Sequence, residues 1–282
     1  MALPTYKNIK EASRIYLLPC LFTASNLFFG FIAIIRCIQA KYSPVAPLEP
    51  SHYYTQAVWF ILLACVADVF DGLAARIGGK ESLFGKEFDS LADLVSFGLA
   101  PALMVFFFIL SPTEGYPFFR QVGWFVGFIY LLCAAIRLAR FNVITSPFLE
   151  IEELKGIKSF IGLPVPAAAG LIASLVLVLN EFDLQRWAIW ILGLMLLIAF
   201  LMVSHIPFPS LKNLNWIAEA KVWSFLLLVF LLGVVFIFGQ AGFFILFLGY
   251  IFFGLFRHWQ KRFRKLSRKP ETPPSEEDWI DL

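Results

Sequence analysis

Residues 61–93 read ILLACVADVFDGLAARIGGKESLFGKEFDSLAD, and this stretch contains Asp68, Asp71, Asp89 and Asp93. The first two lie three residues apart and the last two lie four apart, so each pair shares one face of a helix. The first pair also interrupts an apolar run, where a charge is costly and indicates a functional site. Taken singly, each aspartate fits a helix cap, a solvated face or an Asp-Gly turn equally well. The four together favour a shared site.

The composition around this stretch is that of a membrane protein. Of 282 residues, 60% are hydrophobic, 33 are Phe and only 15% are charged, which exceeds the apolar share of soluble domains. We therefore predict an all-α, polytopic transmembrane helix bundle with about eight spans, since a span needs about 20 apolar residues. The predicted spans are 15–39, 57–77, 91–111, 118–138, 161–180, 186–204, 222–239 and 241–257. Only Gly239, Gln240 and Gly242 separate the last two, which a re-entrant hairpin would also explain.

The short loops predict the orientation of the bundle. Lys and Arg precede the first span, follow the second and fourth spans, and cluster again at 257–269, whereas the loops 40–56, 112–117 and 181–185 contain only Lys41. Because Lys and Arg are more frequent in the cytoplasmic loops of membrane proteins, we predict that both termini face the cytoplasm. The basic cluster at 257–269 fits anionic lipid headgroups, and without a basic folded domain we predict no nucleic-acid binding.

Neither cysteine nor histidine chemistry is indicated. The four cysteines have no CxxC spacing and the three histidines form no HExxH arrangement. A zinc site or a disulfide framework is therefore not predicted.

The aspartates instead predict a site for hard cations. If the second and third spans pack antiparallel, the two pairs meet near the cytoplasmic surface, and their carboxylates repel one another unless cations lie between them. Carboxylate oxygens suit Mg²⁺ or Mn²⁺, and two such ions form the usual clamp for in-line displacement at phosphorus. A carboxylate would then accept the proton of an attacking hydroxyl.

Residues beside the aspartates fit the same chemistry. Arg76 follows Asp71 by about one turn and would hold a phosphate or pair with a carboxylate. Gly72 and Gly85 permit close approach of a substrate. An ion-coupled transporter is the alternative class, and the clustering of the aspartates at one membrane face rather than at the midplane disfavours it.

The pattern DxxDGxxARx8GxxxDxxxD, filled by Asp68, Asp71, Gly72, Ala75, Arg76, Gly85, Asp89 and Asp93, resembles the signature of the CDP-alcohol phosphatidyltransferase family. The resemblance implies a membrane-embedded six-helix core, a homodimer and release of CMP. It implies that Asp68, Asp71 and Asp89 bind two metal ions, and that Asp93 borders the metals and is the general base. The intervening Gly72, Ala75, Arg76 and Gly85 would face the nucleotide and its diphosphate.

Five further segments are similar to bacterial and archaeal CDP-diacylglycerol-serine O-phosphatidyltransferases within that family. They are LPCLFTASNLFFGFIAI (18–34), SFGLAPA (96–102), RLARFN (137–142), GLPVPAAAG (162–170) and MVSHIPFPS (202–210). This similarity implies transfer of a phosphatidyl group from CDP-diacylglycerol to L-serine in a prokaryotic inner or cell membrane. Glycerol phosphate or inositol as the acceptor, and CDP-archaeol as the donor, remain alternatives.

The acceptor and the nucleotide need contacts of their own. Serine carries a carboxylate, for which Arg137 or Arg140 offers a cation, while Ser96 and Asn142 offer hydrogen bonds. Membrane anchoring or phosphate binding explains the two arginines equally well. Thr23 and Asn26 border the nucleotide or form a polar contact between helices.

The expected organisation is one catalytic domain with two flanking segments. These are a cytoplasmic N-terminal segment at 1–14, the transmembrane catalytic domain at 15–257, and a basic, then acidic cytoplasmic tail at 258–282.

Overall fold

The computed structural model describes residues 17–42, 49–77, 83–110, 117–144, 162–182, 187, 189–208 and 233–267. Their regular secondary structure is helical, as predicted. The elements are α2 (Leu17–Tyr42), α3 (Pro50–Ile77), α4 (Leu83–Asp93), η1 (Leu94–Leu99), α5 (Ala100–Leu110), α6 (Pro117–Ile144), α7 (Val165–Glu181), α8 (Ile189–Val203) and α11 (Gln240–Ser267).

Five helical segments are long and apolar enough to cross a membrane. They are Cys20–Tyr42, Pro50–Leu73, Phe84–Ile109, Gln121–Ile144 and Gln240–Gln260, and the third is the continuous rod formed by α4, η1 and α5. The helices α7 and α8 are apolar but shorter. Seven of the eight predicted spans therefore correspond to a helix, while the predicted span at 222–239 lies mostly outside the described residues.

Two of the observed helices begin well before the apolar runs that predicted them. The second starts at Pro50 rather than 57, and the third starts at Leu83 rather than 91. Periodicity of apolar residues finds only the part of a helix that lies in hydrocarbon, whereas a helix extends into the aqueous layer wherever its polar residues are solvated. As a result, Asp89 and Asp93 lie inside helical structure.

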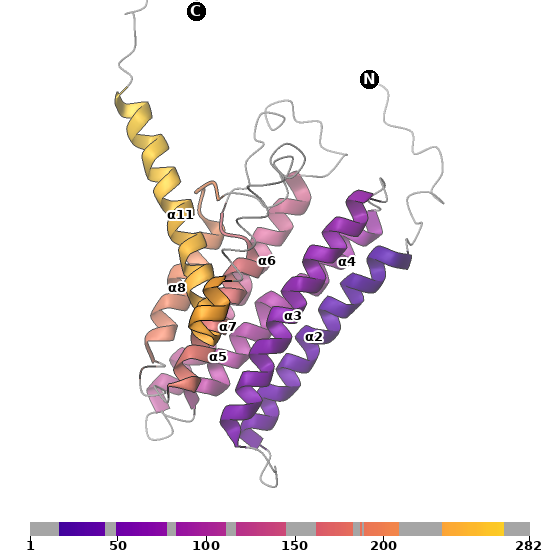
Figure 1. The fold of residues 1–282 in the computed structure, drawn as a ribbon, viewed down its shortest axis with the longest axis vertical. Coiled ribbons are helices and arrows are strands. Elements are labelled where there is room, and N and C mark those ends of the chain that lie inside the picture. The colour runs from indigo at the N-terminus through magenta and orange to yellow at the C-terminus, as the bar shows by residue number, and fades with distance from the viewer. Residues whose placement is uncertain are drawn as a thin grey trace, which may run out of the picture.

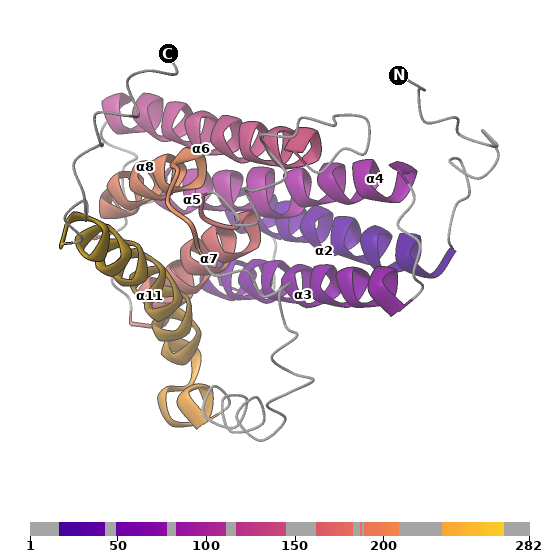
Figure 2. The same cartoon turned by 90° about the horizontal axis from the view of Figure 1, so that it is seen from above.

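The helix α2 lies between α3 and the α4–η1–α5 rod, as Figure 2 shows from above. Its packing against α3 is the most extensive in the bundle. The start of α2, the end of α3, the start of α4 and the end of α6 gather at the same end of the molecule (Figure 1). That end contains all four aspartates.

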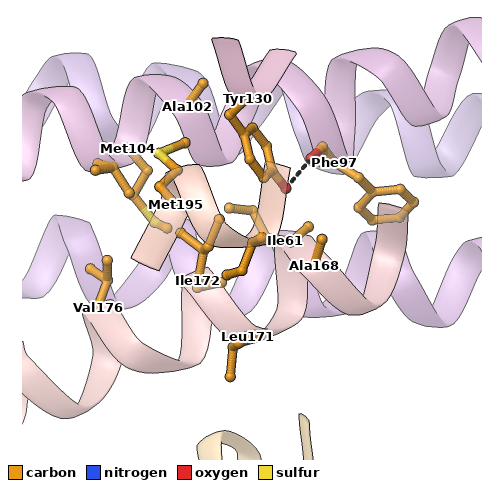
Figure 3. Packing of buried hydrophobic residues seen from close by; sticks show 14 of the residues in the cluster. Ile61, Phe97, Ala102, Met104, Tyr130, Ala168, Leu171, Ile172, Val176 and Met195 are labelled. Atoms are coloured by element: carbon orange, nitrogen blue, oxygen red, sulfur yellow. Dashed lines mark hydrogen bonds between the residues drawn. The ribbon is translucent and has the colours of Figure 1, made fainter. Parts of the chain in front are cut away.

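A close-packed core joins α3, α5, α6, α7 and α8 (Figure 3). Ile61, Met104, Ile172 and Met195 are completely buried there. Tyr130 is also buried, and its hydroxyl donates a 3.0 Å hydrogen bond to the carbonyl of Phe97 in η1. The core thus holds α6 at a fixed position beside the rod that carries Asp89 and Asp93.

A small residue, Gly170, lets α7 and α11 approach closely. A Cβ placed on Gly170 would lie 2.2 Å from the ring of Phe247 in α11. The residues before α7 contact the residues after α8. Gly162, with φ +89°, donates its N–H to the backbone carbonyl of Ile206 over 2.9 Å. Gly239, with φ +57°, forms a turn directly before α11.

The outer faces of the helices carry many large apolar side chains. Trp124, Phe128, Trp190, Phe200 and Phe252 are each more than half exposed. Exposing an apolar surface of this size to water is unfavourable, whereas lipid solvates it. Together with the five long apolar helices, this surface identifies a membrane protein.

Candidate active site

Three of the four aspartates meet at the end of the bundle. Asp68 of α3 and Asp89 and Asp93 of α4 can each offer a carboxylate oxygen such that the three oxygens lie within 4.8 Å of one another. Asp93 is 7% exposed, and the other two are partly buried. The acidic pairs therefore converge, although Asp71 lies outside the group of three.

The helix α2 connects the two acidic pairs. Thr23 Oγ1 donates a 2.7 Å hydrogen bond to Asp71 Oδ2, and Asn26 Nδ2 donates a 2.9 Å hydrogen bond to Asp93 Oδ1. Both donors are buried and lie one turn apart on one face of α2. The sequence left a nucleotide contact and a helix-to-helix contact open for these residues, and the structure shows the second.

A π-helix follows Asp93 directly and brings the rod close to α2. Ser96 Oγ donates a 2.8 Å hydrogen bond to the carbonyl of Asn26. A Cβ placed on Gly30 would lie 2.3 Å from that same Oγ, so Gly30 permits this approach. Ser96 is completely buried, and its hydroxyl hydrogen is already engaged. A π-helix at this point agrees with the frequent occurrence of such bulges at functional sites.

Asn142 joins the end of α6 to α4 through hydrogen bonds. Its Nδ2 donates to Ser90 Oγ over 2.9 Å and to Glu87 Oε2 over 3.1 Å, while its backbone carbonyl accepts from Lys86 Nζ over 3.2 Å. This network sets the position of α6 relative to the carboxylates.

Arg137 of α6 interacts electrostatically with two of the three clustered aspartates. It is within electrostatic range of Asp93, Tyr250 and Asp68, and its Nε is enclosed without a hydrogen-bond acceptor in the described part of the chain. Arg140, one turn further along, is also partly buried. Of the four predicted acceptor contacts, Arg137 is the one with an electrostatic interaction with Asp93 and Asp68.

The structure places the remaining predicted residues unevenly. Gly72 and Gly85 lie in α3 and α4, and a Cβ added to Gly72 would meet nothing within 4 Å, which leaves space beside Asp71. Ala75 and Arg76 lie in the last turns of α3, but their side chains are outside the described part of the structure.

Sequence reasoning missed two contributions to this region. Tyr250 of α11 comes within electrostatic range of Arg137, and its ring stacks on Phe208 with centroids 6.3 Å apart. Ser90 and Glu87 hold Asn142. A tyrosine in an apolar span gives no sequence signal, whereas Glu87 and Ser90 are polar residues in the same helix as Asp89 and Asp93.

An apolar hollow of about 460 Å³ lies beside the site on the flank of α2. Its lining residues are Ala24, Leu27, Phe28, Phe31 and Val95. It begins within one turn of Thr23 and Asn26, so an apolar chain lying there would be next to the carboxylates.

Comparison with known proteins identifies the family of the chain. The sequence profile of the CDP-alcohol phosphatidyltransferase family matches residues 16–201. A CDP-diacylglycerol–serine O-phosphatidyltransferase of Helicobacter pylori is 36% identical over 228 residues, which cover 79% of this chain and 83% of the relative.

Two further relatives come from distant organisms. A protein of the same name from Bacillus subtilis is 34% identical over 196 residues, covering 70% of this chain and 92% of the relative. An archaetidylserine synthase of Methanothermobacter thermautotrophicus is 32% identical over 210 residues, covering 74% and 76%. With a profile match over residues 16–201 and relatives of this similarity along most of their length, the chain belongs to the CDP-alcohol phosphatidyltransferase family.

Proposed function

We propose that the protein transfers a phosphatidyl group from CDP-diacylglycerol to the hydroxyl of L-serine, giving phosphatidylserine and CMP. The observation that carries this proposal is the convergence of Asp68, Asp89 and Asp93 at one end of an apolar bundle. The names of the relatives in Helicobacter pylori and Bacillus subtilis support serine as the acceptor.

The donor set of the acidic group fits a hard divalent cation. Three carboxylates whose oxygens lie within 4.8 Å repel one another strongly unless positive charge lies between them. All these ligand atoms are oxygens, which favours Mg²⁺ or Mn²⁺. We assign Asp68, Asp71 and Asp89 to holding two such ions, with Asp93 bordering them. Bound ions would neutralise the diphosphate and stabilise the departing phosphate of CMP.

Asp93 is the proposed general base. The serine hydroxyl oxygen forms a bond to the lipid-linked phosphorus, the bond from that phosphorus to the CMP oxygen breaks, and the hydroxyl proton passes to the Asp93 carboxylate. Because Asp93 Oδ1 accepts a hydrogen bond from Asn26 Nδ2, this contact would hold the carboxylate in one orientation.

The neighbouring residues would hold the nucleotide and the lipid. We assign Gly72, Ala75, Arg76 and Gly85 to the CDP moiety, with the open space at Gly72 as support. The apolar hollow along α2 would receive an acyl chain that enters sideways from the bilayer.

We further propose that the active site faces the cytosol of a prokaryotic cell, with both termini on that side, and that the enzyme is a homodimer. Serine and CMP would then exchange with the cytosol while the lipids remain in the membrane. The basic residues near the predicted cytoplasmic ends support this orientation.

The test is a panel of acceptors. The purified protein is given CDP-diacylglycerol, Mg²⁺ or Mn²⁺, and serine, glycerol phosphate or inositol, and CMP release is measured. CMP release with serine, but not with glycerol phosphate or inositol, supports the proposal. Turnover with glycerol phosphate or inositol but not with serine rejects the acceptor, and serine flux into vesicles without CDP-lipid would support a transporter instead.

The lipid donor has one further candidate. The similarity to an archaetidylserine synthase favours testing CDP-archaeol as well. A comparison of kcat/KM for the two donors with serine as the acceptor decides between them.

A further inference from the structure

Asn26 has a buried oxygen that no described residue satisfies. Its side chain is completely buried, its Nδ2 donates to Asp93, and its backbone carbonyl accepts from Ser96. Its Oδ1 is enclosed and receives no hydrogen bond from the described residues. Burying an acceptor without a donor costs free energy, so a ligand that supplies a donor is favoured there.

A second enclosed polar atom belongs to a residue that interacts electrostatically with the same carboxylate. Arg137 Nε is a donor without an acceptor among the described residues, and Arg137 is within electrostatic range of Asp93. The described residues thus leave one acceptor unsatisfied on α2, beside the proposed base, and one donor on α6, in a charged side chain that interacts electrostatically with that base.

Serine presents the complementary groups. Its ammonium is a donor, its carboxylate is an anionic acceptor, and its hydroxyl lies between them on a short chain. We propose that Asn26 Oδ1 accepts a hydrogen bond from the serine ammonium and that the Arg137 guanidinium binds the serine carboxylate, which together present the hydroxyl to Asp93. This inference rests on the proposed function and makes Asn26 a residue that determines acceptor specificity.

The other predicted acceptor contacts are occupied differently. Ser96 Oγ donates to the backbone carbonyl of Asn26, and the side-chain amide of Asn142 donates to Ser90 and Glu87. Both residues support the position of α2 or α6. The alternative occupant of Asn26 Oδ1 is the amino group of cytosine, and a contact of that kind would be felt with every acceptor.

The chain offers a matched control in Asn180 of α7. Its Nδ2 donates to Ser51 Oγ and Thr55 Oγ1, both over 3.0 Å, and its Oδ1 is likewise enclosed without a donor among the described residues. Ser51 precedes Asp68 by 17 residues of α3, which at 1.5 Å per residue is about 25 Å. Asn180 is therefore a buried asparagine of the same kind, remote from the carboxylates.

The experiment compares acceptors that lack one group each. Full-length enzyme in detergent micelles is assayed for CMP release with L-serine, with ethanolamine, which lacks the carboxylate, and with 3-hydroxypropionate, which lacks the ammonium. The variants are Asn26→Ala, Asn26→Ser, Arg137→Gln and Asn180→Ala. Thermal unfolding of each variant shows whether it is folded.

We expect the wild type to prefer serine over either analogue by at least about tenfold in kcat/KM, as one lost charged hydrogen bond implies. Asn26→Ala and Asn26→Ser should remove the preference for serine over 3-hydroxypropionate but not that over ethanolamine. Arg137→Gln should do the reverse, and Asn180→Ala should leave both ratios unchanged. Such a pattern couples each side chain to one group of the substrate.

Several results overturn the inference. An equal loss with all acceptors, accompanied by a raised KM for CDP-diacylglycerol, would place Asn26 at the nucleotide. Unchanged ratios in the Asn26 variants would mean that water satisfies Oδ1. If neither Asn26 variant folds, the wild-type enzyme provides the test. A wild type without a preference for serine over 3-hydroxypropionate has no site that recognises the serine ammonium. A wild type that uses another acceptor but never serine is a different result, which rejects the proposed function itself.

Discussion

Thr23 Oγ1 on α2 donates a 2.7 Å hydrogen bond to Asp71 Oδ2 on α3, across 48 residues of sequence. One turn later, Asn26 makes the equivalent contact with Asp93. The first helix contributes no carboxylate, yet it contacts one member of each acidic pair. The positions of the proposed metal ligand Asp71 and the proposed base Asp93 therefore both depend on how α2 packs.

Loss of the Thr23 hydroxyl should weaken metal binding. In Thr23→Val the side chain keeps its shape, but Asp71 loses a hydrogen bond of the charged kind, worth about 1.5–3 kcal/mol. We expect the Mg²⁺ or Mn²⁺ concentration for half-maximal CMP release to rise several-fold. Ser25→Ala is the control, because Ser25 Oγ bonds only to the Leu21 carbonyl of its own helix among the described residues. An unchanged metal requirement in Thr23→Val would contradict this role.

Asp93→Asn should abolish turnover while largely preserving CDP-lipid binding. An amide cannot accept the hydroxyl proton, and general-base catalysis contributes about 10²–10⁴-fold in rate. CMP release measures the first effect, and equilibrium binding of CDP-diacylglycerol in micelles measures the second. Turnover near that of the wild type would remove Asp93 as the base.

Asp68→Ala should raise the metal requirement, because a member of the group of three carboxylates is lost. Titration of Mg²⁺ and Mn²⁺ into metal-free enzyme measures the shift, and chelation of the wild type should stop the reaction reversibly. Glu181→Ala, an exposed acidic residue at the end of α7, is the control. Identical titration curves for the Asp68 and Glu181 variants would argue against a metal at Asp68.

Gly30→Ala should destabilise the bundle and lower activity. The added Cβ would lie 2.6 Å from the Cα of Ser96, so α2 and η1 must separate. Overpacking of this kind costs about 1–3 kcal/mol. The midpoint of thermal unfolding in detergent and the rate of CMP release are the measurements. Gly193→Ala in α8, where the Cβ meets nothing within 4 Å, should show no such loss.

Tyr130→Phe should lower stability by about 1 kcal/mol, since the buried carbonyl of Phe97 loses its donor. The thermal unfolding midpoint measures the effect, and Tyr42→Phe, at an exposed tyrosine, serves as the comparison. Equal midpoints for the two variants would show that the Tyr130 hydrogen bond contributes nothing net.

The predictions from sequence were most accurate where the signal is local. Apolar runs located seven helices, and the spacing of Asp68, Asp71, Asp89 and Asp93 identified the acidic site. Both signals come from residues within a few turns of one another. The starts of α3 and α4 were predicted too late because a solvated helical turn has no apolar period.

The sequence by itself determined that this chain forms an apolar helix bundle with two acidic pairs near one end, because hydrophobicity and residue spacing follow directly from the order of the amino acids. Only the tertiary structure decided that α2 hydrogen-bonds to one aspartate of each pair, that Asn26 rather than Ser96 or Asn142 has a buried polar atom without a partner among the described residues, and that Arg137 is within electrostatic range of Asp93. Hydrogen bonds between residues 48 or 67 positions apart depend on which helix faces meet, and that is fixed by packing of the whole bundle.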